Sequence, residues 1–132
     1  MDAGHEQELL KELRQALLRL HKTLLDWERG MYERANGSRL TSNQLLDALL
    51  VDPQFAWLRA LSQMIVRIDE MLADEIAPGP GDLEVVLGHL RDLTSPNETG
   101  NAYEQRYYTA LQQSPDAVFA HRDLVTLVKQ KK

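Results

Sequence analysis

The most constraining feature of this sequence is a helical repeat that fills a long stretch near its beginning. Apolar residues recur there every three or four positions, which is the spacing of one face of an α-helix. These residues are Leu9, Leu13, Leu17, Leu20, Leu24, Trp27 and Met31. We therefore predict one long helix from about Glu6 to Ala35.

Turn signals divide the rest of the chain into shorter helices. Gly37 should end the first helix, and Thr41 or Ser42 should cap a short second helix with the sequence NQLLDALLV. A third helix is predicted from Asp52-Pro53 to about residue 77, followed by a loop at PGPG, residues 78–81. Further helices are predicted over about residues 82–93, 101–113 and 115–129.

The predicted fold is all-α: a single helical bundle of about five to six helices with a long N-terminal helix. The turns are short, and neither a strand pattern nor an internal repeat is present. A chain of 132 residues is long enough to bury one sizeable core, and 43% hydrophobic with 27% charged residues is ordinary globular composition. We predict one domain over residues 1–132, with residues 1–5 disordered.

The charge balance and the N-terminal segment narrow the classes of partner. A formal net charge of -5 argues against binding to nucleic acid or to an anionic membrane. No apolar run approaches the roughly 18 to 20 residues of a membrane span. The segment MDAGHEQELLKEL is polar and lacks a signal-peptide core, so we expect a cytoplasmic protein.

Several kinds of reaction chemistry lack their residues. The chain has no cysteine, so thiolate catalysis and Cys-ligated zinc are excluded. No histidine follows a glutamate by three positions, as in di-iron bundles, and HEQEL has Leu9 where a zinc protease needs its second histidine. PGPG lacks the lysine of a phosphate-binding loop. We predict no metal, no cofactor, no catalytic residue and no enzymatic activity.

One polar position nevertheless needs an explanation. Asp69 lies roughly 60° from the centre of the apolar stripe of its helix, at the edge of the core. A buried carboxylate without a partner costs several kcal/mol, so Asp69 should be paired. The first helix offers Arg14, His21 and Glu28, which are seven residues apart and line one flank, and the last helix offers His121 on its apolar face.

We therefore predict a buried polar cluster formed by Glu28, Tyr32, Asp69 and His121. A carboxylate that orients an imidazole can serve a binding site, but it also satisfies a histidine inside a core. A cavity within the cluster would indicate ligand binding, whereas a closely packed cluster would indicate a structural role.

Three blocks of the chain resemble a family of small bacterial proteins with no assigned activity. The blocks are LHKTLLDWERGMYERANG, DPQFAWLRALSQMIVRIDE and YYTALQQSPDAVFAHRDL. They extend from about Leu20 to Leu124. The resemblance implies a bacterial, cytoplasmic helical protein and assigns no reaction to any residue.

Apolar residues outside the main stripes suggest an interaction surface. Leu18 and Leu25 lie on the far flank of the first helix, and Phe119 and Leu127 face away from the stripe of the last one. We predict a homodimer with the first helix as the candidate interface, and a protein partner as a second role. The favoured function is a non-enzymatic protein-interaction or regulatory module. The alternative is a bundle that binds or senses a small ligand through the polar cluster.

Overall fold

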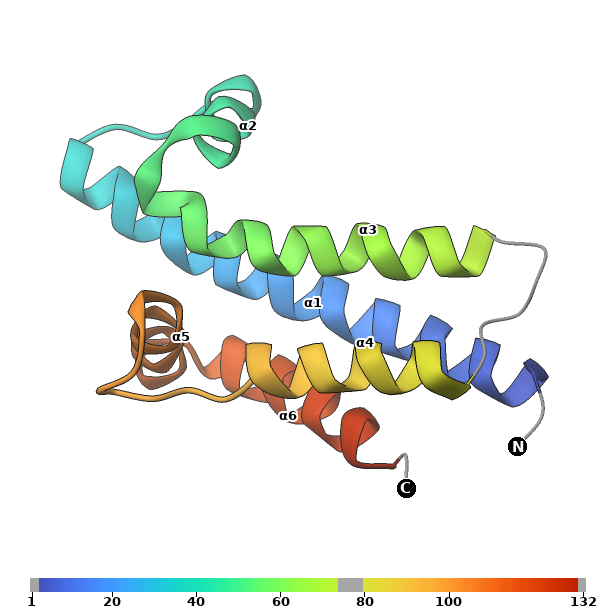
Figure 1. Ribbon diagram of the computed structural model, residues 1–132. Coiled ribbons are helices and arrows are strands. Elements are labelled where there is room, and N and C mark those ends of the chain that lie inside the picture. Colours follow the sequence, from blue (N-terminus) through green and yellow to red (C-terminus); the bar gives the residue numbers. More distant parts are fainter. Residues whose placement is uncertain (1–2, 74–79, 131–132) are drawn as a thin grey trace.

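The computed structural model describes residues 3–73 and 80–130, and every regular element within these ranges is a helix (Figure 1). The elements in chain order are α1 (Ala3–Asn36), α2 (Ser42–Val51), the 3-10 helix η1 (Pro53–Leu58), α3 (Arg59–Ala73), α4 (Pro80–Leu93), α5 (Ala102–Gln113) and α6 (Pro115–Gln130). The predicted all-α bundle with a long N-terminal helix is therefore confirmed.

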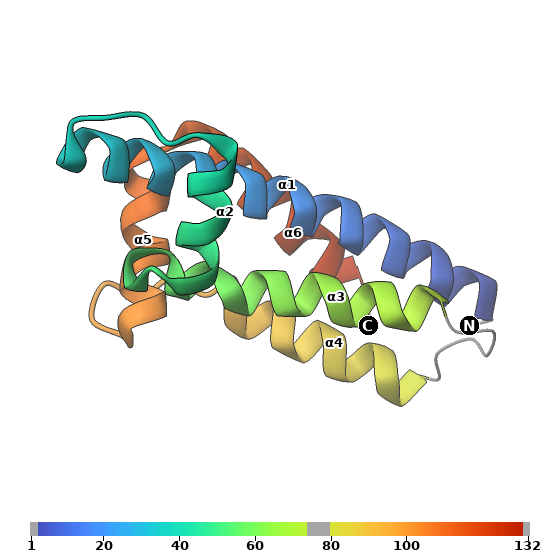
Figure 2. The ribbon, with the colours of Figure 1, turned by 90° about the horizontal axis from the view of Figure 1, so that it is seen from above.

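Helix α1 is the central element, and the other helices are arranged around it. It packs most extensively against α6 and α3. Figure 1 shows α3 and α4 extending along the bundle on either side of α1, while α5 lies across one end. From above, α3 and α4 are side by side, and α2 crosses the bundle near the C-terminal half of α1 (Figure 2). The end that carries α2 and α5 also contains η1 and the C-terminal part of α1.

The core is built on the leucines of α1. Six of them are at most 6% exposed: Leu9, Leu10, Leu13, Leu17, Leu20 and Leu24. Facing residues of the other helices are equally buried, among them Leu61 and Ile68 of α3 and Leu124 of α6. The leucines of the predicted stripe on the first helix are thus the core surface, and Leu10 from its flank joins them. Trp27 packs against this core while partly buried, and Met31 at the end of the stripe is half-buried.

The helix ends follow the local signals in the sequence. Gly37 has a φ of 72°, the left-handed conformation that ends α1. The Thr41 hydroxyl accepts from the backbone N–H of Gln44, and the Gln44 side chain accepts from the N–H of Thr41, which completes a capping box. Asp52 and Ser114 likewise accept backbone N–H groups at the starts of η1 and α6.

Three predictions about element boundaries need correction or qualification. Residues 3–5 belong to α1, so the disorder predicted for residues 1–5 is wrong for these three. Of the predicted PGPG loop, Pro80 and Gly81 form the start of α4, because proline suits the first helical turn; residues 78 and 79 lie outside the described residues. The helix predicted from Asp52 begins instead as the 3-10 helix η1, and its predicted end near residue 77 also lies outside the described residues.

A matched pair of leucines tests the position of the core. Leu20 is 0% exposed and Leu50 is 66% exposed. We expect Leu20→Ala to lower the free energy of unfolding by about 3 kcal/mol, since it leaves a cavity in the core. Leu50→Ala should change it by less than about 0.5 kcal/mol. Urea unfolding followed by circular dichroism measures both, and equal effects would contradict this assignment.

Candidate functional site

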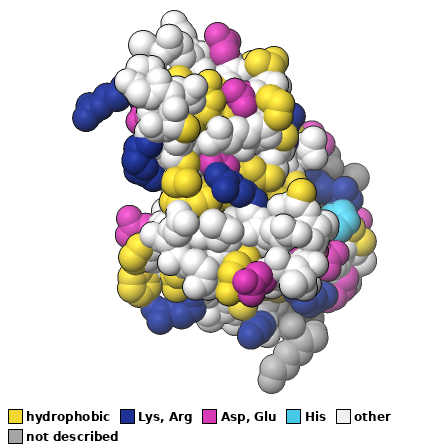
Figure 3. Space-filling model, turned by 90° about the vertical axis from the view of Figure 1, so that its left-hand side faces the viewer, with side chains coloured by type: hydrophobic (Ala, Val, Ile, Leu, Met, Phe, Trp, Pro, Cys, Tyr) yellow, Lys and Arg dark blue, Asp and Glu magenta, His cyan; other side chains and the backbone are white. Residues whose placement is uncertain are grey.

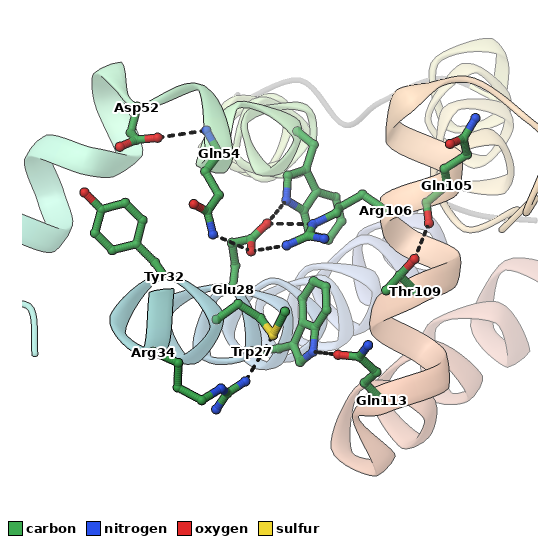
Figure 4. A network of polar contacts seen from close by, with 12 residues as sticks. Trp27, Glu28, Tyr32, Arg34, Asp52, Gln54, Gln105, Arg106, Thr109 and Gln113 are labelled. Carbon is green, nitrogen blue, oxygen red and sulfur yellow. Dashed lines mark hydrogen bonds and ion pairs between the residues drawn. The ribbon is translucent and has the colours of Figure 1, made fainter. Parts of the chain in front are cut away.

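Glu28 is the most unusual side chain of the protein, because it is a carboxylate with 0% exposure. Its two oxygens accept hydrogen bonds from two different parts of the chain (Figure 4). From η1, Gln54 Nε2 donates to Oε2 at 3.1 Å and Trp57 Nε1 donates to Oε1 at 2.8 Å. From α5, Arg106 donates through Nε to Oε1 at 3.0 Å and through Nη2 to Oε2 at 2.5 Å. A bidentate guanidinium and two neutral donors compensate for the desolvation of the charge.

The 3-10 form of η1 explains how Gln54 and Trp57 reach the same carboxylate. Side chains three residues apart eclipse each other in a 3-10 helix, whereas in an α-helix they diverge by about 60°. Asp52 accepts the N–H of Gln54 and so starts the segment in this conformation. The departure from the predicted α-helix therefore places both donors on Glu28.

Arg106 is itself held in place by an aromatic ring. Its guanidinium lies 4.5 Å from the centroid of the Trp27 ring, a cation–π contact. The indole N–H of Trp27 donates to Gln113 Oε1 of α5 at 3.1 Å (Figure 4). Adjacent residues of α1, Trp27 and Glu28, thus both bind α5 and fix it across the end of the bundle.

A polar seam continues from Glu28 along the contact between α1 and α3. We use this name for the pairs Arg14–Asp69 and His21–Ser62 together with Glu28 and its η1 donors. Arg14 Nε donates to Asp69 Oδ1, and Ser62 Oγ lies 2.9 Å from His21 Nε2. Along the seam the residue number on α1 increases by seven from one pair to the next, while the residue number on α3 decreases by seven. This is the pattern that an antiparallel pair of helices requires. The polar flank predicted on the first helix is therefore a contact surface.

His121 lies at the end of a row of aromatic rings that begins at Trp57. Ring centroids are 5.7 Å apart for Trp57 and Tyr103, 5.9 Å for Tyr103 and Tyr107, and 5.5 Å for Tyr107 and His121. Burial, and then the neighbouring Tyr103, raise the pKa of Tyr107. Burial, and then Lys129, lower the pKa of His121. The Tyr107 hydroxyl lies 2.6 Å from His121 Nδ1, so the two side chains share a hydrogen bond at the end of this row.

The structure separates the residues that we predicted to form one cluster. Asp69 pairs with Arg14, which precedes Glu28 by fourteen residues, or about 21 Å along α1. His121 is joined to the Glu28 network only through intervening rings. The single cluster is therefore wrong, because its members belong to different places along α1.

Tyr32 has an apolar role rather than a polar one. Its ring centroid lies 5.5 Å from that of Phe55, and its side chain packs against the core. The prediction that Asp69 lies at the core edge with a partner is confirmed, since the side chain is 46% exposed and bonded to Arg14. Partial burial of His121 is also confirmed.

Sequence reasoning missed Arg106, the strongest partner of Glu28. Arg106 follows Glu28 by 78 residues and stands among tyrosines in YEQRYY. Its position on α5 is visible in the sequence, but nothing there indicates which helix α5 crosses. Gln54 and Trp57 stand in the stretch PQFAWL, which is largely apolar, so the sequence gives no sign that their side chains donate to a carboxylate.

The chemistry available at these groups is limited. In the part of the chain that the structure describes, no group of three or more histidine, aspartate and glutamate side chains is arranged to hold a metal ion. No helix among the described residues is long and apolar enough to cross a membrane. Glu28 is enclosed, and each of its oxygens accepts two hydrogen bonds, so the carboxylate itself has no free position for a ligand.

Compared with models of protein families, with curated proteins and with solved structures, the chain shows no significant match.

Substitutions of two carboxylates should show that the buried part of the seam contributes more to the free energy of unfolding than its exposed part does. Glu28→Gln should lower the free energy of unfolding by about 3 kcal/mol, because an amide cannot accept all four bonds and leaves Arg106 without a counter-ion. Asp69→Asn should lower it by less than about 1 kcal/mol, since that ion pair is partly solvated. Urea unfolding measures both. A cost for Glu28→Gln as small as that for Asp69→Asn would show that Glu28 does not hold α5 in place.

Two half-buried histidines predict how stability depends on pH. Burial lowers the pKa of His21 and of His121 below the ordinary value of 6.5. As pH falls through 6.5, the unfolded chain takes up protons that the folded protein does not, so the free energy of unfolding decreases. Replacing both histidines, His21→Gln with His121→Asn, should flatten the curve between about pH 7 and pH 5.

The exposed His89 provides a matched control for this measurement. His89→Gln should leave the slope of stability against pH as it is in the original protein. Urea midpoints at several pH values give the three slopes. An unchanged slope in the double variant would contradict the effect of burial on the two histidines.

Proposed function

We propose that this protein is a non-enzymatic interaction module that associates with a second copy of itself through helix α2. One observation carries the proposal: α2 presents Leu46, Leu50 and Val51 to solvent at 56%, 66% and 77% exposure. Large apolar side chains gathered in this way on a surface usually mark an interface. A cytoplasmic setting, as expected from the sequence, is part of the proposal.

The position of α2 explains why its apolar face remains uncovered. Only Ala48 of this helix is buried, and the contacts of α2 are mainly with η1. The capping box fixes the start of the helix, and Arg59 Nε donates to the carbonyl oxygen of Leu49 at 3.1 Å near its end. The leucines are thus held outward by a fixed helix. Figure 3 shows hydrophobic side chains at the surface in the upper half of the view, the end of the molecule where α2 lies.

This location replaces the interface expected on the first helix. Six leucines of α1 are buried, and Leu18 and Leu25 on its far flank are half-buried, so α1 leaves less apolar surface exposed than α2 does. Phe119 of α6 is 56% exposed, as predicted, but Arg122 lies 5.5 Å from its ring centroid, and Leu127 packs against the core. The exposed leucines of α2 therefore favour it as the contact surface.

The distribution of charge favours a second copy of this chain as the partner that binds the exposed face of α2. Two chains that each carry a net charge of -5 repel each other unless they meet through neutral surfaces. Helix α2 carries one formal charge, at Asp47, and its remaining residues are uncharged. A two-fold contact places the same patch on both sides, so leucines meet leucines. The patch is small beside the roughly 800 Å² that each partner buries in a stable complex, so the dimer should be weak.

The ligand-binding alternative lacks a supporting observation. Glu28, Asp69 and His121 are each bonded to other side chains at separate places, and Glu28 is enclosed. Among the residues that the structure describes, these three groups lie at different places along α1 and do not converge on one small molecule.

Light scattering over a wide range of protein concentration tests the proposal. We expect the mean mass to rise from the monomer value toward twice that value. The variant Leu46→Glu with Leu50→Glu should remain a monomer throughout, because it places like charges opposite each other. Its surface position should leave the thermal midpoint nearly unchanged.

Val118 provides the control, since it is also an exposed apolar side chain but lies on α6 at 42% exposure. Val118→Glu should associate as the original protein does. A monomer mass for the original protein at the highest concentration would overturn the proposal, and so would an equal loss of association in the Val118 variant.

A further inference from the structure

A second surface, remote from the exposed face of α2, has the form of a groove. Two adjoining hollows of about 510 Å³ and 520 Å³ lie between α3 and α4 and continue to the start of α5. They share Ala60 of α3 with Asp92 and Leu93 of α4, so they form one continuous groove. Figure 2 shows the two helices side by side over this length. Contact between α3 and α4 is sparse compared with that between α1 and α3.

The groove has an apolar lining and a charged rim. The apolar part of its lining is formed by Ala56, Trp57, Ala60, Met64, Leu93 and Tyr103, and polar side chains such as Gln63 and Asn101 line it as well. Val66, which is 54% exposed, adds an uncovered apolar side chain at one end. Apolar linings flanked by charge are typical of surfaces that bind an amphipathic segment.

The rim is predominantly acidic. It carries the carboxylates of Glu70, Asp92 and Glu104 and the guanidinium of Arg67, which gives a formal charge of -3 + 1 = -2 without His89. Glu70 stands on the α3 wall and Asp92 on the α4 wall, and both are exposed. A cationic partner therefore meets opposite charge on both sides of the groove.

The length and the walls of the groove suit a helix. From Trp57 to Glu70 the lining spans thirteen residues, or about 20 Å, which corresponds to between three and four turns. The small side chains of Ala56 and Ala60, one turn apart, allow a close approach. A helix laid there would pack against α3 and α4 in the way that neighbouring helices pack in a bundle.

We propose that this groove binds an amphipathic helix of a partner protein, with apolar residues on one face and lysine or arginine on its flanks. This inference goes beyond self-association through α2 and does not depend on it. The apolar face would cover Val66, Leu93 and Tyr103, while the basic flanks would lie near Glu70 and Asp92.

Two synthetic peptides of about 15 residues, each between four and five helical turns, provide the probes. Both carry leucine on one helical face; the remaining positions are lysine in one peptide and glutamate in the other. Titration of the full chain, followed by backbone amide NMR shifts, gives the affinity and the location of each. We expect the lysine peptide to bind at least about fivefold more tightly and to shift Val66, Leu93 and Tyr103 rather than Leu46 and Leu50.

Charge reversal in the groove separates this site from general attraction to an acidic protein. Glu70→Lys with Asp92→Lys should abolish or reverse the preference for the lysine peptide. Glu12→Lys with Glu84→Lys changes the net charge by the same amount at exposed positions outside both the groove and α2, and should retain the preference. Circular dichroism confirms that each variant is folded.

Three results would overturn the proposal: no binding of the lysine peptide, shifts that map outside the groove, or an equal loss of preference in both charge variants. The monomeric variant Leu46→Glu with Leu50→Glu should bind the lysine peptide as the original chain does. Failure of self-association and failure of groove binding are therefore observed independently.

Discussion

The enclosed carboxylate of Glu28 is the interaction on which the arrangement of the other elements depends. A charge removed from water costs several kcal/mol unless nearby groups replace its hydration. Here the replacement comes from η1 and α5, so neither element can move without exposing the carboxylate or leaving it unpaired. Glu28 thus acts as a geometric constraint, because only one placement of the two elements satisfies it.

This constraint extends from the core to the surface of the protein. Trp57 donates to Glu28 and also lines the groove, where its ring meets Tyr103 of α5. Tyr103 in turn donates through its hydroxyl to the carbonyl oxygen of Leu93 at the end of α4, at 2.7 Å. A chain of contacts therefore leads from the buried acid to the wall of the groove. The acid contributes by fixing this wall, since its own oxygens have no free position for a substrate or a metal.

The helical periodicity of the sequence predicts on which side of its helix each polar residue lies, but it does not predict which residues pair with each other. The spacing of Arg14, His21 and Glu28 predicts one line on the first helix, and the spacing in the third predicts Asp69 at the edge of its apolar stripe. Which of the three meets Asp69 depends on how α3 is shifted along α1, and that is decided by the packing of the whole core. The pairing of Glu28 with Arg106 requires the position of α5 as well. The leucines of α2 show the same limit, because NQLLDALLV has the composition of a buried helix and the structure leaves half of its leucines exposed.

Burial increases along the polar seam from the Arg14–Asp69 pair to Glu28. This difference matters for both proposed surfaces, the exposed face of α2 and the groove. Arg14 and Asp69 have side chains 34% and 46% exposed, whereas Glu28 at the other end is fully enclosed. Water reaches both side chains of the first pair, whereas in the second pair the carboxylate is enclosed and Arg106 alone is partly exposed, at 32%. The same kind of interaction is therefore weaker at the Arg14 end than at the Glu28 end. The strong end is the one that holds η1 and α5, and α2 packs against η1. The face of α2 and the α5 end of the groove are therefore both attached to the part of the bundle where the polar contacts are most enclosed. A surface held in this way loses little conformational freedom when a partner binds, which favours association even through a small contact.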